Sequence, residues 1–221
     1  MNTLATPEVA ATLQRLFSEA AVISPESSLF LSRLDDAERA RLMRSKTDYA
    51  SFYHQLRHLP LAVSRQTGEL LYMLARAGGA RSIIEFGTSF GVSALYLASA
   101  LRDNGGGRLI STEFEASKIG RAREALHEAK LLDIVELREG DALQTLAGDL
   151  PDEIDLLFLD GAKGLYPEVL QLVQGRLRPG AMVVADDAAT NPDYQQYMRQ
   201  AGNGYRSIPL GDGLELSLRL G

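Results

Sequence analysis

The stretch from Arg81 to Ser93, RSIIEFGTSFGVS, constrains the fold more than any other part of this 221-residue chain. It opens with a short apolar, β-branched run at Ile83 and Ile84, turns through a glycine, and takes on helical spacing of apolar residues from Gly91 onward. A buried strand, a tight glycine turn and a helix form the first unit of a nucleotide-type α/β domain. Such a turn directs backbone N–H groups and a helix start toward whatever lies above the carboxyl end of the strand.

The same alternation of strand and helix patterns continues to the end of the chain. After a helix at 64–77 and the first strand, we expect helices at 92–102, 116–130, 142–150 and 166–176, and strands at 108–113, 135–141, 154–160 and 181–186. Pro179-Gly180 is expected to form a turn before the last of these strands, and 205–219 an antiparallel hairpin. This pattern predicts a Rossmann-like, doubly wound α/β fold with a mostly parallel seven-stranded sheet and a C-terminal antiparallel hairpin.

The first 60 residues have a different character and no motif of their own. Apolar spacing predicts an amphipathic helix at 1–21, and the charge-dense stretch 35–44 is typical of a helix with a solvated face. Residues 47–61 contain several aromatic and histidine side chains, which either cover a pocket, form an interface or pack into the core. We therefore expect a helical segment at 1–60, which serves as a cap or lid over the pocket or as the dimerisation interface of a homodimer, and one ligand-binding domain at 61–221.

The composition limits the classes of function. The net charge is −6, which argues against a protein that coats nucleic acid. The absence of cysteine excludes disulfides, thiolate metal sites and cysteine catalysis. No apolar run is long enough for a membrane helix and no signal peptide is recognisable, so we expect a cytoplasmic protein with a small-molecule substrate.

The glycine turn does not have the spacing of a dinucleotide or Walker loop. Its glycines, Gly87 and Gly91, are separated by Thr88, Ser89 and Phe90 rather than arranged as G-x-G-x-x-G. An acid, Glu113, ends the second strand, where ribose hydroxyls would need an acceptor. With Glu85 and the Gly140-Asp141-Ala142 sequence, this set favours a ligand with a sugar and a base but no phosphates.

These motifs resemble the S-adenosylmethionine site of class I methyltransferases. The sequences 159–166 (LDGAKGLY), 184–187 (VADD) and 209–215 (PLGDGLE) are more narrowly similar to the small O-methyltransferases related to catechol and caffeoyl-CoA O-methyltransferases. The resemblance spans about 60–221. It implies a cofactor site made by Glu85, Gly87, Thr88, Ser89, Gly91, Ser93, Glu113, Phe114, Asp141, Ala142 and Asp160. Within it, Ser93 would reach the methionine carboxylate and Glu113 the ribose.

The resemblance also implies a divalent metal and a general base. The metal ligands map to Asp160, Asp186 and Asp187, with Asp187 replacing the usual asparagine of the family, and Lys163 maps to the base. Carboxylate oxygens suit Mg²⁺. The alternative is that Asp186 and Asp187 only cap the next helix. Glu215 and Tyr166 fall at positions that suggest contact with the substrate.

We therefore expect an S-adenosylmethionine-dependent O-methyltransferase that acts on a small phenolic or catechol-like molecule, assisted by a metal and Lys163. Three enzyme alternatives remain: a metal-independent N- or O-methyltransferase, a tRNA-modifying methyltransferase, and a Rossmann dehydrogenase. A non-catalytic cofactor-binding protein is the alternative from another class.

Overall fold

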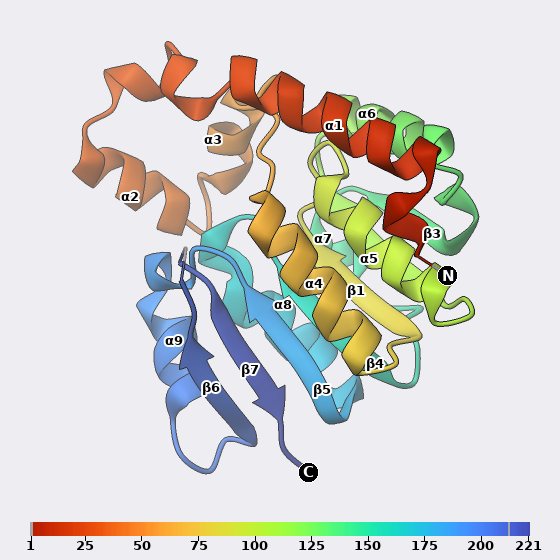
Figure 1. Cartoon of the computed structure of the whole chain (residues 1–221). Coiled ribbons are helices and arrows are strands. Elements are labelled where there is room, and N and C mark those ends of the chain that lie inside the picture. Colours follow the sequence, from red (N-terminus) through yellow and green to blue (C-terminus); the bar gives the residue numbers. More distant parts are fainter. Residues whose placement is uncertain (1, 212) are drawn as a thin grey trace.

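A seven-stranded sheet forms the centre of the molecule in the computed structural model, which describes residues 2–211 and 213–221 (Figure 1). The strands lie in the order β3-β2-β1-β4-β5-β7-β6. Their bounds are β1 Ser82–Phe86, β2 Arg108–Glu113, β3 Val135–Glu139, β4 Ile154–Leu159, β5 Leu177–Ala185, β6 Tyr205–Pro209 and β7 Glu215–Arg219. The pairs among β1–β5 are parallel, whereas β7 runs antiparallel to both β5 and β6. The predicted fold class, including its terminal hairpin, is confirmed.

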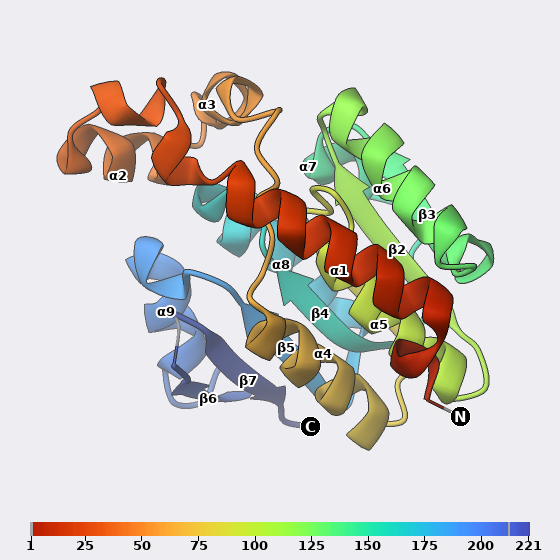
Figure 2. The same cartoon turned by 45° about the horizontal axis from the view of Figure 1, so that its top comes forward.

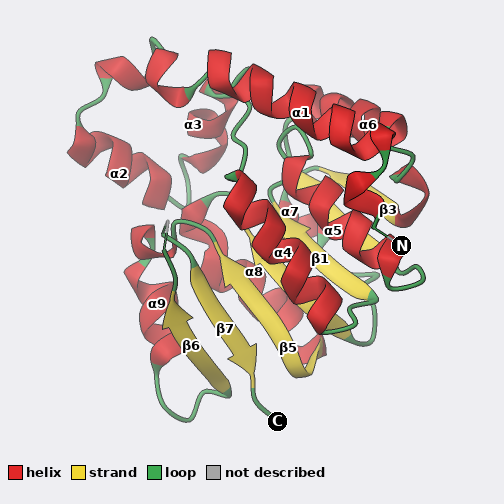
Figure 3. Cartoon of the chain, viewed as in Figure 1, coloured by secondary structure: helices red, strands yellow, loops and turns green. Residues whose placement is uncertain are grey.

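Helices cover both faces of the sheet, as Figure 3 shows by colour. One layer contains α1 (Pro7–Val22), α4 (Arg65–Ala77), α5 (Val92–Asp103) and α6 (Ala116–Glu128), and the other contains α7 (Ala142–Thr145), α8 (Tyr166–Val173) and α9 (Pro192–Arg199). Successive side chains of a strand point to opposite faces, so Ile83 packs into the first layer and Ile84 into the second. Both are fully buried, which explains the continuous apolar run of this strand.

Two local predictions were wrong. Pro179-Gly180 does not form a turn before the last parallel strand, because β5 begins at Leu177 and runs through both residues. The register between β4 and β5 shifts between Ile154 and Leu156, and this irregularity accommodates the proline and glycine. The helix expected at 142–150 is shorter, since α7 spans only Ala142–Thr145. The structure also contains α9, which was not predicted, and its N-terminus is capped by the Asn191 side chain, which accepts from the Tyr194 amide at 3.0 Å.

The N-terminal residues lie across one end of the sheet. After α1, which packs on α5 and α6, the chain forms α2 (Asp36–Arg44) and α3 (Tyr49–Gln55), and Figures 1 and 2 both show these helices beyond the carboxyl ends of the parallel strands. Leu31, Phe52, Leu56 and Leu59 form a small apolar core within this segment. No helix in the described ranges is long and apolar enough to cross a membrane.

The position of β1 between β2 and β4 determines where a ligand would bind. It pairs with β2 on one side and with β4 on the other, so the order of the strands reverses direction between β1 and β4. In open α/β sheets, ligands bind outside the carboxyl ends of the strands at such a reversal. The turn after β1 and the ends of β2 and β4 meet at this edge, beneath α3.

Candidate active site

The glycine turn after β1 is held tightly against its neighbours. The amides of Gly87 and Thr88 both donate to the carbonyl of Thr112 at 3.1 Å, which fixes the turn on the end of β2. Gly87 has φ of +103° and Gly91, the N-cap of α5, has φ of +90°, a region that L side chains rarely adopt. These two glycines are therefore required by the backbone, as the sequence motif indicated.

Beneath the turn lies a buried carboxyl group. Glu85 is fully buried and accepts a hydrogen bond from the Ser111 hydroxyl through Oε2, whereas Oε1 has no partner among the described residues. Burial raises the pKa of Glu85 to about 7, although the Ser111 and Ser93 hydroxyls oppose the shift. The Thr88 hydroxyl lies 2.5 Å from that of Ser111, so these polar groups support the turn from below.

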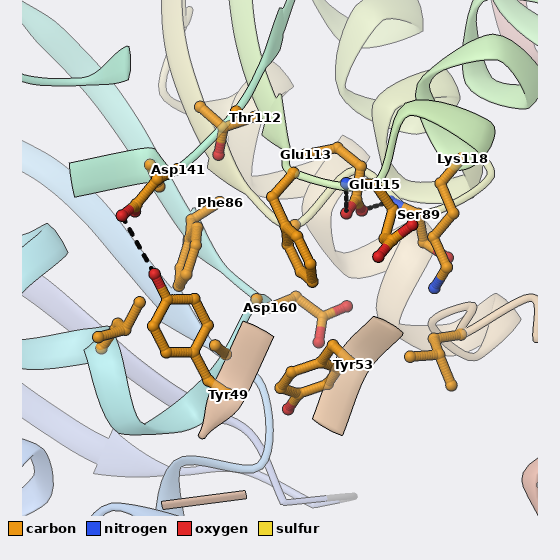
Figure 4. Close-up of a pocket in the computed structure, with 18 residues that line it drawn as sticks. Tyr49, Tyr53, Phe86, Ser89, Thr112, Glu113, Glu115, Lys118, Asp141 and Asp160 are labelled. Carbon is orange, nitrogen blue, oxygen red and sulfur yellow. Dashed lines mark hydrogen bonds between the residues drawn. The ribbon is translucent and has the colours of Figure 1, made fainter. Parts of the chain in front are cut away.

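A first cavity opens above the turn (Figure 4). Of the predicted cofactor residues, it is lined by Gly87, Ser89, Glu113, Phe114, Asp141, Ala142 and Asp160. The Glu113 carboxylate accepts from the Ser89 amide at 2.9 Å and from the Glu115 amide at 3.1 Å, which fixes its position at the end of β2. Burial raises the pKa of Glu113, and the Lys118 ammonium opposes this shift. The cavity wall thus combines a fixed carboxylate with a buried cation.

Helix α3 closes this cavity from the N-terminal side. Tyr49 and Tyr53 project from it into the cavity, and Figure 4 shows the Tyr49 hydroxyl bonded to Asp141, at 3.1 Å. On the same helix, His54 Nδ1 lies 2.6 Å from a carboxylate oxygen of Glu115. The cap is therefore fastened to the sheet domain at two acidic residues on the rim of the cavity.

A second cavity, of about 410 Å³, adjoins the first. The two share Tyr53, Leu61, Asp160 and Gly161 in their linings. The wall of the second cavity is mostly apolar and comes from the cap, including Leu31, Met43, Phe52 and Leu56, while its floor comes from the ends of β4 and β5. Such a wall suits an aromatic or aliphatic molecule.

The floor of the second cavity is a cluster of one lysine and three acids. Lys163 Nζ lies 2.7 Å from Asp160, 3.5 Å from Asp186 and 4.0 Å from Asp187. Burial alone would lower the pKa of Lys163, but the negative charge of the acids outweighs it and raises that pKa. Burial, and then the charge of Asp160, raises the pKa of Asp186 to about 7.

The cluster does not form a preformed metal cage, because the lysine ammonium lies among the acids. Within the described ranges, no three acidic or histidine side chains are placed so that they could hold one ion. The donor chemistry nevertheless fits a divalent cation, because three carboxylates, which are oxygen donors, face a single ammonium.

Comparison with known proteins identifies the family. Residues 84–188 match a family model described as a methyltransferase domain. The chain is 34% identical over 130 residues to the catechol O-methyltransferase of Niastella koreensis, which covers 58% of each protein. The structure of the O-methyltransferase TomG from Streptomyces achromogenes, solved in complex with SAM, is 32% identical with a TM-score of 0.65, covering 84% of this chain and 96% of that one. The chain belongs to the S-adenosylmethionine-dependent O-methyltransferases related to catechol and caffeoyl-CoA O-methyltransferases. A cofactor-bound protein from MTB is 28% identical with a TM-score of 0.67, covering 82% and 95% of the two chains.

In this O-methyltransferase, four predicted cofactor residues lie below the cavity rather than in its lining. Glu85, Thr88, Gly91 and Ser93 form the strand end, turn and helix start that hold the lining residues in place. Ser93 is buried at the start of α5. The role of each toward the cofactor stays a prediction.

The two predicted substrate residues of the methyltransferase are buried elsewhere. Glu215 is fully buried and paired with Arg199, at 2.7 Å from its Nε. The Tyr166 hydroxyl lies 2.9 Å from the Leu159 carbonyl and 2.8 Å from the Asp186 carbonyl, where it braces the ends of β4 and β5. Among the described residues that line the two cavities, neither appears.

Several polar residues of the cavity linings were not assigned to the site from the sequence. They include Arg39, Tyr49, Tyr53, Glu115 and Lys118. The aromatic content of 47–61 was a usable signal for Tyr49 and Tyr53, whereas Arg39 and Lys118 stand in helices where charged residues normally face solvent.

Proposed function

We propose that this enzyme transfers the methyl group of S-adenosylmethionine to a hydroxyl of a small phenolic or catechol-like molecule, with the help of Lys163 and a divalent metal, most simply Mg²⁺. The observation that carries the proposal is the junction of the two cavities at Asp160 and Gly161. One cavity has the residues expected for the cofactor, and the other has an apolar wall and a polar floor. A methyl donor and an acceptor held on the two sides of this junction would meet there.

Alignment is the main demand of the reaction. The sulfonium already activates the methyl group, so the protein must hold the acceptor oxygen in line behind the methyl carbon. Glu113 and Asp141 would hold the donor, and the apolar wall with Phe52 and Leu56 would hold the acceptor. Tyr53, which lines both cavities, would exclude water from the region between them.

The acceptor hydroxyl must also lose its proton. The acids raise the pKa of Lys163, so in the absence of a cation its Nζ is an ammonium. A divalent cation held by these acids would offset their charge, and the neutral amine would then accept the proton of the acceptor hydroxyl. Asp160, Asp186 and Asp187 would hold the metal, which when bound stabilises an anionic oxygen. The finding that the lysine lies among these acids also supports a metal-independent variant, in which the ammonium itself stabilises the acceptor oxyanion.

The cap would act as a lid over both cavities. Residues 20–62 contribute to the lining of both, and α3 is fastened at Asp141 and Glu115. Val22 and Leu29 in the same segment are 79% and 76% exposed, which favours the homodimer expected from the sequence, with the cap at its interface.

The experiment that tests this function is a calorimetric titration with S-adenosylmethionine, first in EDTA and then in excess Mg²⁺, followed by turnover with catechol. We expect cofactor binding in both conditions, a separate Mg²⁺ signal that Asp160→Ala abolishes, and methylated catechol as product. Cofactor binding and turnover without any metal signal would select the metal-independent variant. Absence of cofactor binding would refute the proposal.

A further inference from the structure

One cation in the acceptor cavity has no place in the chemistry described above. Arg39 projects from α2 into the lining of the cavity, together with the apolar side chains of the cap. We propose that Arg39 binds a carboxylate of the acceptor, which makes the natural substrate an aromatic acid that also has a hydroxyl group. This inference rests on the proposed function and defines its substrate class.

The hydrogen bonding of Arg39 leaves its charge unmatched. Nη2 donates to the Leu31 carbonyl at 3.2 Å, a neutral acceptor that directs the side chain, and the buried Nε has no partner among the residues that the structure describes. Burial of such a donor without a partner is costly. A planar guanidinium pairs readily with a carboxylate, so an acceptor carboxylate in the cavity would match the charge of Arg39 through the terminal nitrogens of the guanidinium.

A neighbour on the same helix shows the contrasting arrangement. Arg41 forms ion pairs with Glu38 at 2.8 Å and Asp48 at 3.1 Å, and its side chain is 54% exposed. It is therefore a surface residue of the usual kind. Arg39 and Arg41 are the same type of residue on the same helix, but only the Arg39 side chain lines the cavity.

The charges of the cavity are separated into two groups. Its three acids all lie within 4.0 Å of Lys163 Nζ, at the floor. The floor is thus negative overall and would repel a carboxylate, whereas the Arg39 position is positive. An acceptor with a hydroxyl at one end and a carboxylate at the other matches this layout when the hydroxyl points to Lys163.

One end of α2 packs beside the floor of the cavity, and Arg39 lies further along the helix. The carbonyl of Arg44, at the end of α2, packs against Gly164, where a Cβ atom would lie 2.6 Å from it. Arg39 precedes Arg44 by five residues, so at the usual helical rise its Cα lies about 7.5 Å back along the axis from this contact. Met43, Phe52 and Leu56 provide an apolar wall for such a ring.

The test compares two probes that differ only in the carboxylate, catechol and 3,4-dihydroxybenzoate. Their binding to the enzyme saturated with S-adenosylhomocysteine is measured by calorimetry for the wild type, Arg39→Gln and the matched control Arg41→Gln. We expect the wild type and R41Q to bind 3,4-dihydroxybenzoate at least tenfold more tightly than catechol. In R39Q this ratio should fall by about tenfold to a hundredfold, as the loss of a hydrogen bond to a charged group predicts.

Two results would overturn the inference: a wild-type enzyme that does not prefer the carboxylated probe, or an R39Q variant that keeps the preference. Turnover with the same two acceptors separates this from the proposed function. Methyl transfer to both without preference would retain the function and reject the role of Arg39. Binding that depends on Arg39 without methyl transfer to either acceptor would retain the carboxylate site and count against the O-methyl transfer.

Discussion

Gly87 lies so close to the backbone of Asp160 that a Cβ atom at residue 87 would stand 2.6 Å from the Asp160 carbonyl oxygen. The Asp160 amide in turn donates to the carbonyl of Phe86 at 2.8 Å. The glycine turn that shapes the cofactor cavity and the aspartate on the floor of the acceptor cavity are therefore joined through their backbones. A change in one position must displace the other.

We expect Gly87→Ala to impair both cavities. The new methyl group would meet the backbone of residues 160 and 161, and φ at this position is +103°. The strain should lower the free energy of unfolding by about 1–3 kcal/mol or more and weaken S-adenosylmethionine binding at least tenfold. Thermal unfolding and calorimetry measure these effects. Gly120→Ala is the control: it lies within α6 with open space around it, so it should be neutral or stabilise by up to about 1 kcal/mol. Equal stability and equal S-adenosylmethionine affinity of Gly87→Ala and Gly120→Ala would contradict the steric argument.

Lys163→Met should separate catalysis from cofactor binding. Turnover should fall about 10²–10⁴-fold because the acceptor loses its proton-handling group, while cofactor affinity should change little because Lys163 does not line the first cavity. Removing the ammonium also leaves the three acids without a counter-charge, which should cost about 3 kcal/mol of stability.

The control for this variant is Lys46→Met. Lys46 pairs with Glu168 and its side chain is 55% exposed, so its removal should change stability and turnover only slightly. Turnover in K163M equal to that of K46M would exclude Lys163 from the chemistry.

Glu85 should give the ligand-free protein a distinct dependence of stability on pH. Burial raises its pKa from an ordinary value of 4.5 to about 7, so between these values the unfolded chain loses the proton and the folded protein keeps it. The free energy of unfolding should therefore fall as the pH rises through this range, by at most about 3 kcal/mol from this group. Denaturant unfolding of the wild type and Glu85→Gln, from pH 4.5 to 8, measures the difference. If the free energy of unfolding has the same pH dependence in the wild type and in Glu85→Gln, Glu85 is ionised throughout or its environment differs from the one described.

Tyr49→Phe should loosen the cap over the cofactor. The variant loses the hydrogen bond from the hydroxyl to Asp141 but keeps the ring, which packs edge-on against Phe114 at 6.4 Å. Release of S-adenosylhomocysteine should become about three- to tenfold faster, as expected for one lost hydrogen bond. Stopped-flow displacement measures the rate. Tyr197→Phe loses an exposed hydroxyl contact to Gln174 far from the cavities, and the same acceleration in that variant would argue against the role of Tyr49.

The sheet was predictable from the sequence because its strands are buried on both faces. Ile83 and Ile84 need apolar surroundings on opposite sides, and this requirement is visible as a continuous apolar run. Helix α9 was predictable in principle, since Asn191 followed by Pro192 is a strong helix start. The turn predicted at Pro179-Gly180 was wrong because a parallel strand usually excludes proline. The shift in register that admits the proline is visible only in the pairing of β5 with β4.

The acceptor cavity was not predictable to the same degree. The charge pattern of residues 35–44 predicts a solvated helix, and Arg39 and Arg41 are indistinguishable within it. Only the position of α2 over Gly164 decides which arginine points inward. Likewise, the motifs located Asp160 and Lys163 correctly at one sheet edge but could not show that the ammonium lies among the acids.

The wall of the second cavity comes from residues 20–62, whereas its floor comes from residues 160–187. The two contributions are encoded in stretches of the chain that are far apart. Mutations can therefore accumulate in the first segment and reshape the cavity, while the reactive floor and most of the donor cavity remain intact. Exchange of this segment between homologues would be a route by which a single methyl-transfer apparatus acquires new substrates during evolution.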